Sequence, residues 1–140
     1  MKTKLFLFIL SLSLCYVNPS FAQQADSVVV EILEKSSQSW DGTYLPNYPS
    51  GQPEITIARI TLPPKYKLPV HKHPIPLGGI VLEGSITVTR EDGVKKVFNA
   101  GDAVIELVNT WHYGMNEGDT PTVLLAFYVG TKDKPITINQ

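Results

Sequence analysis

From Glu54 onward the chain alternates short apolar, β-branched runs with turn residues. Runs of this kind, bounded by Gly, Pro, Asn and Asp, are typical of β-strands. Asp92-Gly93 is a two-residue hairpin signal between two of them. The pattern predicts strands over 55–62, 70–73, 79–82, 85–90, 95–99, 103–108, 112–115 and 122–130. Many short strands with regular turns predict an all-β domain that is closed or built from two sheets.

The chain before Glu54 has a different pattern. Asp26 to Lys35 fits a first strand or a short helix, and its three consecutive valines favour a strand. Trp40 to Pro53 is rich in Gly, Pro, Tyr and Asn, which is typical of an irregular arm. The aromatic side chains of this arm either cover the core, which we expect, or line the mouth of a pocket: Trp40, Tyr44 and Tyr48. We therefore expect an N-terminal strand and aromatic arm over 23–53 and a β-barrel over 54–140.

The first 22 residues have the pattern of a secretory signal peptide. Lys2 and Lys4 precede an apolar run, and Ser20-Phe21-Ala22 offers small residues at the positions that signal peptidase recognises. Cleavage is expected after Ala22, which predicts a periplasmic or secreted protein. A lipoprotein acylated at Cys15 is the alternative, and the bulky Leu14 before that cysteine argues against it. The apolar run is too short to span a bilayer, so no membrane span is expected.

Composition excludes several function classes. Without Lys2 and Lys4, ten of the twelve basic residues remain against thirteen acidic ones, a net charge of −3. There is no basic patch, so nucleic acid is not an expected partner. The single cysteine leaves with the leader. The rest of the chain therefore has no disulfide and no thiol chemistry, and its stability must come from packing.

The three histidines of the chain, His71, His73 and His112, are its most informative residues. His71 and His73 are two apart in a predicted strand, so their side chains point to the same face. His112 begins another predicted strand. Any one of them alone is more easily explained as a surface histidine. Together they predict a site in which imidazole nitrogens bind one metal ion, for which zinc, copper, iron and nickel are suitable.

Two spaced motifs resemble those of the cupin superfamily. The first runs from Pro64 to Pro74 around the His-Lys-His unit and ends at Gly84. The second contains Gly101-Asp102, Asn109, His112 and Asn116. The chain departs from the family pattern at four places. Lys65 stands where the family has glycine, Leu77 and Gly78 stand where it has glutamate, Leu107 replaces a proline, and Asn109 replaces a frequent glycine.

The resemblance implies a small double-stranded β-helix, or jelly-roll barrel, with a metal site. Because the family's glutamate is missing, it implies three neutral imidazoles as ligands, as in the three-histidine dioxygenase cupins. The expected cofactor is a divalent transition metal, namely Fe, Zn, Ni or Mn. A homodimer is also expected, because cupins often pair through sheet edges and 26–35 is a plausible exchanged strand.

Glu106 is the carboxylate that we expect near this ion. Three neutral ligands leave a +2 charge in an apolar barrel, and a carboxylate would offset it. Three-histidine cupins that cleave β-diketones are similar at this place. Glu106 fits a fourth ligand, a general base or a partner that orients a histidine, and equally an outward-facing surface residue. The rest of the interior is expected to be apolar, lined by Leu77, Ile80, Trp111, Met115 and Phe127.

The first hypothesis for function is an exported cupin metalloenzyme that acts on a small oxygenated substrate. Dioxygenation and enolate or isomerase-type chemistry both fit, with sugar acids from polysaccharide breakdown as one substrate class by analogy of fold. The second hypothesis is a barrel that binds a ligand without turnover. The third is a structural metal site in a dimer subunit. More than one substrate class and more than one metal fit the sequence.

Overall fold

The computed structural model describes residues 27–140. It divides the chain into two units, Met1–Val30 and Glu31–Gln140, and the architecture is that of the second. The predicted signal peptide, 1–22, lies outside the described residues. No helix among the described residues is long and apolar enough to cross a membrane.

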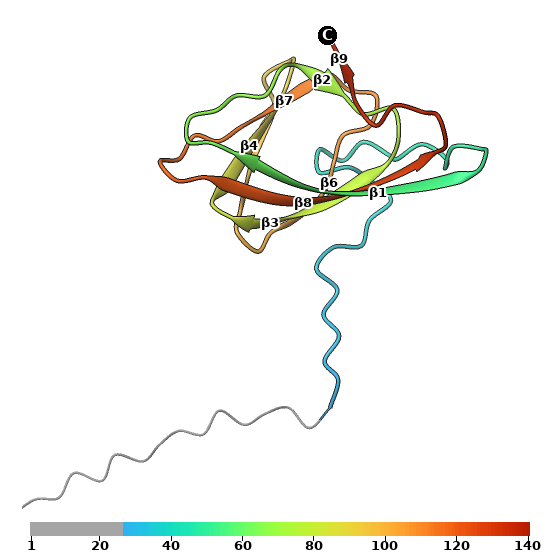
Figure 1. Cartoon of the computed structure of the whole chain (residues 1–140), viewed down its shortest axis with the longest axis horizontal. Coiled ribbons are helices and arrows are strands. Elements are labelled where there is room, and N and C mark those ends of the chain that lie inside the picture. Colours follow the sequence, from blue (N-terminus) through green and yellow to red (C-terminus); the bar gives the residue numbers. More distant parts are fainter. Residues whose placement is uncertain (1–26) are drawn as a thin grey trace, which may run out of the picture. The chain divides into compact units, whose positions relative to one another are not determined.

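Glu31–Gln140 consists of nine strands in two sheets (Figure 1). The first sheet has the order β1-β8-β3-β6 and the second the order β5-β4-β7-β2-β9, with every pair of neighbours antiparallel. The predicted all-β, double-sheet jelly-roll fold is thereby confirmed. The strands are β1 Pro53–Leu62, β2 His71–Lys72, β3 Leu77–Glu83, β4 Ser85–Arg90, β5 Lys95–Asn99, β6 Ala103–Ile105, β7 His112–Met115, β8 Thr122–Thr131 and β9 Ile138–Asn139.

The core lies between the two sheets and follows from strand alternation. Along β1, Ile60 and Leu62 point inward, whereas Ile55 and Ile57 are exposed on the outer face. The inward residues meet apolar side chains from the second sheet. The fully buried cluster consists of Leu62, Val81, Ile86, Val88 and Phe98.

The second sheet positions the histidines. β7 lies between β4 and β2, and β2 in turn lies between β7 and β9. His71 is directly opposite His112 on one side and Asn139 on the other. β9 was not predicted, because it contains only two residues, Ile138–Asn139, after a turn-rich stretch. It fixes the C-terminal end of the chain beside the strand that carries His71.

The prediction of a strand over 26–35 was wrong. Asp26 lies outside the described residues, and 27–35 form no strand. Val28, Val29 and Val30 are extended but exposed. Valine favours a strand only when a neighbouring strand accepts its backbone hydrogen bonds and covers its side chain. Among the described residues, Glu31–Lys35 pairs with no other segment.

The aromatic arm also differs from expectation in part. Tyr44 and Tyr48 are exposed rather than packed on the core. Trp40 does pack against the core cluster, and its ring meets Phe98 edge-on with centroids 6.3 Å apart. The Trp40 backbone N–H donates to the carbonyl of Ile105, which attaches the arm to the free edge of β6.

The expectation for the barrel interior was right for Leu77 and wrong for two aromatic residues. Leu77 is buried and lines the interior. Phe127 lies on the exposed outer face of β8, and the inward place is taken by its neighbour Tyr128. Trp111 points outward beneath Lys72. In a strand, an error of one residue moves a side chain to the opposite face.

Two positions keep a backbone conformation that usually requires glycine. Lys65 has φ 60° and Asn109 has φ 54°. These are places where the resembled family pattern has glycine. The left-handed conformation costs a side chain with a Cβ about 1–2 kcal/mol, and asparagine tolerates it better than lysine does. The turns are therefore kept although the residues have changed.

The turn at Lys65 gives a stability prediction. We expect Lys65→Gly to be more stable than Lys65→Ala by about 1 kcal/mol, because only glycine adopts a positive φ without strain. Both variants lose the exposed Lys65–Asp119 ion pair equally. Urea denaturation of the two variants measures the difference. At Lys95 in β5, which has no positive φ, the same comparison should favour alanine. Alanine more stable than glycine at both positions would contradict the account.

Candidate metal centre

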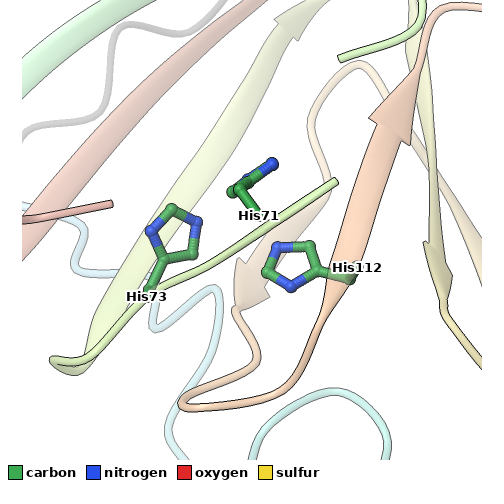
Figure 2. A group of neighbouring side chains, drawn as sticks. All are labelled: His71, His73 and His112. Carbon is green, nitrogen blue, oxygen red and sulfur yellow. The ribbon is translucent and has the colours of Figure 1, made fainter. Parts of the chain in front are cut away.

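The three histidine rings converge on one another from two adjacent strands (Figure 2). His71 belongs to β2, His73 follows it, and His112 begins β7. The ring centroids are 5.0 Å apart for His71 and His73, 4.6 Å for His71 and His112, and 5.3 Å for His73 and His112. One ring nitrogen from each lies within 4.8 Å of those of the other two. The predicted convergence is confirmed.

Strand alternation explains this arrangement. His71 and His73 point into the barrel, whereas Lys72 between them points outward, with its Nζ 4.6 Å from the centre of the Trp111 ring. His73 is held by a short parallel bridge to Val108, and its carbonyl accepts from the N–H of Asn109 at 2.8 Å. The histidines therefore sit on fixed backbone, as a metal site requires.

Each imidazole is oriented by one backbone carbonyl. The Nδ1 atoms of His71, His73 and His112 lie 2.7, 2.8 and 2.8 Å from the carbonyl oxygens of Pro69, Ile136 and Thr110 respectively. A carbonyl oxygen only accepts, so each Nδ1 carries the hydrogen and donates it. Nε2 of each neutral ring then keeps a free lone pair. This is the tautomer in which histidine binds a metal through Nε2.

Burial favours the neutral form of His71 and His73. His71, His73 and His112 are only 9%, 5% and 2% exposed. Burial lowers the pKa of His71 below its ordinary value, against the opposing effect of the hydrogen bond to Pro69. Burial, followed by the neighbouring His112 and His71, lowers the pKa of His73 to about 4. Neutral imidazole is the form that binds a metal, so the donors fit a divalent ion such as Zn²⁺, Fe²⁺, Ni²⁺ or Mn²⁺.

Glu106 lies in the wall of the same cavity as the histidines. Its Oε1 accepts two hydrogen bonds, from Trp40 Nε1 at 2.9 Å and from the backbone N–H of Leu107 at 2.8 Å. The second carboxylate oxygen, Oε2, takes part in neither bond. Glu106 is therefore a partly buried residue of the cavity wall. Its roles as ligand, base or orienting group stay predictions. Glu83 is exposed, as expected.

The sequence did not reveal two further residues of the site. Trp40 lies in the arm, far from the motifs, and holds Glu106 through its indole N–H. Tyr128 lines the cavity, with its ring centroid 5.7 Å from that of His73. Burial and the charge of Glu106 raise the pKa of Tyr128, so it is a neutral phenol that can donate a hydrogen bond. Only the Gly/Pro-rich arm and an aromatic-apolar strand marked these residues in the sequence.

The histidines open into a cavity of about 230 Å³. Its wall is mainly apolar, and polar groups are concentrated at the histidine end, where Glu106, Tyr128, Thr137 and Asn139 also contribute. An apolar cavity of about 150 Å³ is large enough to accept benzene. The site therefore has room for a small organic molecule beside the three Nε2 atoms.

A family model for the cupin domain matches residues 58–128, which run from the middle of β1 into β8 and include all three histidines. The chain belongs to the cupin family. This confirms the resemblance carried by the two motifs. A search of curated proteins finds no match for this cupin.

Solved structures agree on the fold of this cupin. Oxalate oxidase in complex with the substrate analogue glycolate is 19% identical with a TM-score of 0.53, over 61% of this chain and 45% of that one. An uncharacterised double-stranded β-helix protein from Klebsiella pneumoniae is 20% identical with a TM-score of 0.53, and the match covers 65% of this chain and 87% of that one. Bacillus subtilis oxalate decarboxylase, described with Mn(II) centres, is 27% identical with a TM-score of 0.50, and the match covers 61% of this chain and 23% of that one. The cupin thus spans less than half of either oxalate enzyme.

The lowered pKa of His73 gives a prediction for the metal-free cupin. An unfolded histidine binds a proton near pH 6.5, whereas folded His73 does so only near pH 4. With respect to His73, the free energy of unfolding is therefore highest above pH 6.5, where the ring is neutral in both states. It falls by a few kcal/mol at most as the pH drops toward 4, because the unfolded state binds the proton first. Urea denaturation with a chelator present measures this loss. In His73→Gln the loss over this pH range should be smaller. An unchanged pH dependence in the variant would show that His73 is not the group responsible.

Proposed function

We propose that this cupin is a metal-dependent enzyme that acts on a small oxygenated molecule. The observation that carries the proposal is the set of three buried imidazoles, each with Nδ1 donating to a carbonyl and Nε2 free to bind. Three protein ligands leave open positions on a metal for substrate or water, which is the arrangement of catalytic sites. The adjoining cavity gives a substrate access to those positions.

A divalent ion at this site would supply Lewis acidity, and iron would also supply redox chemistry. The residues around it have separate tasks. Glu106 is placed to accept a proton from a bound substrate, because Trp40 and Leu107 fix one of its oxygens. Tyr128 is placed to donate a hydrogen bond to a substrate oxygen. These roles suit either dioxygenation or enolate and isomerase-type chemistry, with sugar acids from polysaccharide breakdown as one substrate class.

Export to the periplasm or the exterior is part of the same proposal and rests on the leader pattern of residues 1–22. A homodimer is proposed as well, since β1 is a ten-residue strand at one edge of its sheet. The competing functions are a non-catalytic binding barrel and a structural metal site. The cavity beside the histidines favours an enzyme or a binding protein, because a structural site is closed by protein ligands.

Metal analysis tests the proposal directly. Protein purified without an affinity tag should hold one divalent ion per chain, measured by plasma mass spectrometry. His71→Ala and His112→Ala should each weaken metal binding by about tenfold or more, because beyond the three site histidines the chain has no histidine that could replace the lost ligand. Circular dichroism should show that both variants stay folded, because the core does not include the ion. Metal content unchanged by these substitutions would overturn the site. Unfolding on chelation would favour a structural metal.

Glu106 is tested against Glu83. Glu106→Gln keeps an oxygen that accepts from Trp40 and Leu107 but removes the charge. We expect it to weaken Co²⁺ affinity by about tenfold, as loss of a group beside a metal typically does. Glu83→Gln, at an exposed position, should change it by less than about twofold. Equal and negligible effects would show that Glu106 does not act on the metal.

A further inference from the structure

Residues 27–140 contribute no cationic side chain to the cavity of this cupin. Among residues 27–140, the groups that line it are apolar or belong to histidine, Glu106, Tyr128, Thr137 and Asn139, together with glycine and Pro69. No lysine or arginine is among them. A second carboxylate or a phosphate on a substrate would thus find no positive partner in the described wall apart from the ion itself.

Two lysines close to the histidines in sequence are held over aromatic rings and do not line the cavity. Lys72 separates His71 from His73 in sequence, yet its ammonium lies over the outward ring of Trp111. Lys67 is 3.7 Å from the centre of the Tyr113 ring. Each contact fixes a positive charge away from the cavity.

Arg90 is likewise unavailable to a ligand. It pairs with the buried carboxylate of Asp41 at 2.9 Å and with Asp92 at 2.6 Å. In β1, Arg59 is exposed in register with Leu125, one position from the inward Ile60.

The charges inside the cavity then limit the net charge of a ligand that can bind there. Three neutral imidazoles contribute nothing, a divalent ion contributes +2, and the Glu106 carboxylate contributes −1. The sum of +1 is neutralised by one negative charge. A second negative charge would be buried against an apolar wall without a partner, which is costly. Apart from its polar groups, the cavity wall is lined by apolar side chains such as Leu68, Ile86 and Leu124.

We propose that the site selects singly charged chelating anions with an apolar tail, such as branched 2-oxo or 2-hydroxy acids, and rejects dianions. This rests on the proposed function, since the ion provides the chelated centre. The head of such a molecule binds beside the histidines, and its tail fills the apolar end of the cavity. The selectivity follows from the outward placement of Lys72 and Arg59, and from the pairing of Arg90, which lies opposite His112 in the sheet, with Asp41 and Asp92. It does not follow from the histidines themselves.

A matched pair of ligands tests the inference without any assay of turnover. 4-Methyl-2-oxopentanoate and 2-oxoglutarate carry the same 2-oxo acid head, but the first ends in a branched alkyl group and the second in a carboxylate. Binding of each to the Co²⁺-loaded cupin is followed by the visible absorption of the ion at constant ionic strength. We expect 4-methyl-2-oxopentanoate to bind at least about tenfold more tightly. Equal affinity, tighter binding of 2-oxoglutarate, or binding of neither would overturn the proposal.

A cavity variant tests the cause of the selectivity. Leu68 is half-buried at the cavity wall, so a longer side chain can be accommodated there. Leu68→Arg should raise the affinity for 2-oxoglutarate relative to 4-methyl-2-oxopentanoate several-fold, whereas the uncharged Leu68→Gln should not. The same ratio in both variants would contradict the charge argument. Failure of the wild-type cupin to bind Co²⁺ would overturn the proposed function itself, before either anion is added.

Discussion

The pairing of β2 with β7 is the constraint on which the rest of the site depends. β2 contains only His71 and Lys72, but it lies between β7 and β9 and is hydrogen-bonded on both sides. His71 is therefore fixed directly opposite His112. Strand alternation then turns His73 to the same side and Lys72 to the other. A shift of one residue in this pairing would turn the histidines outward and the lysine inward.

Backbone carbonyls orient the imidazoles that the strand pairing brings together. The carbonyls of Pro69, Thr110 and Ile136 each accept from one imidazole, so the main chain sets the tautomers, and the Thr137 hydroxyl also lies 3.3 Å from His73 Nδ1. No carboxylate is needed to orient these rings. Glu106 is instead held by the indole of Trp40, and we propose that it acts on the ion or its ligand. The result is a cluster of three imidazoles in the wall of a mainly apolar cavity.

The sequence was sufficient for those parts of the fold that depend on local pattern. The hairpin around Asp92-Gly93 connects β4 and β5 at their predicted bounds, because alternation and turn chemistry act over a few residues. The convergence of the histidines followed from period-two geometry. The missing features depend on distant partners. β9 is too short to carry a pattern, and Trp40 reaches Glu106 across 66 positions of sequence. Nothing local marks that contact.

X-ray absorption spectroscopy of the metal-loaded cupin tests the central claim, that three imidazoles bind one divalent ion through Nε2. With zinc bound, the account predicts three imidazole nitrogens at about 2.0–2.1 Å, with oxygen from water or a carboxylate completing the coordination. The multiple-scattering signal should fit three imidazole ligands in the wild-type protein and two in His71→Ala. A spectrum with fewer than three imidazoles in the wild-type protein, or one left unchanged by that substitution, would contradict the account.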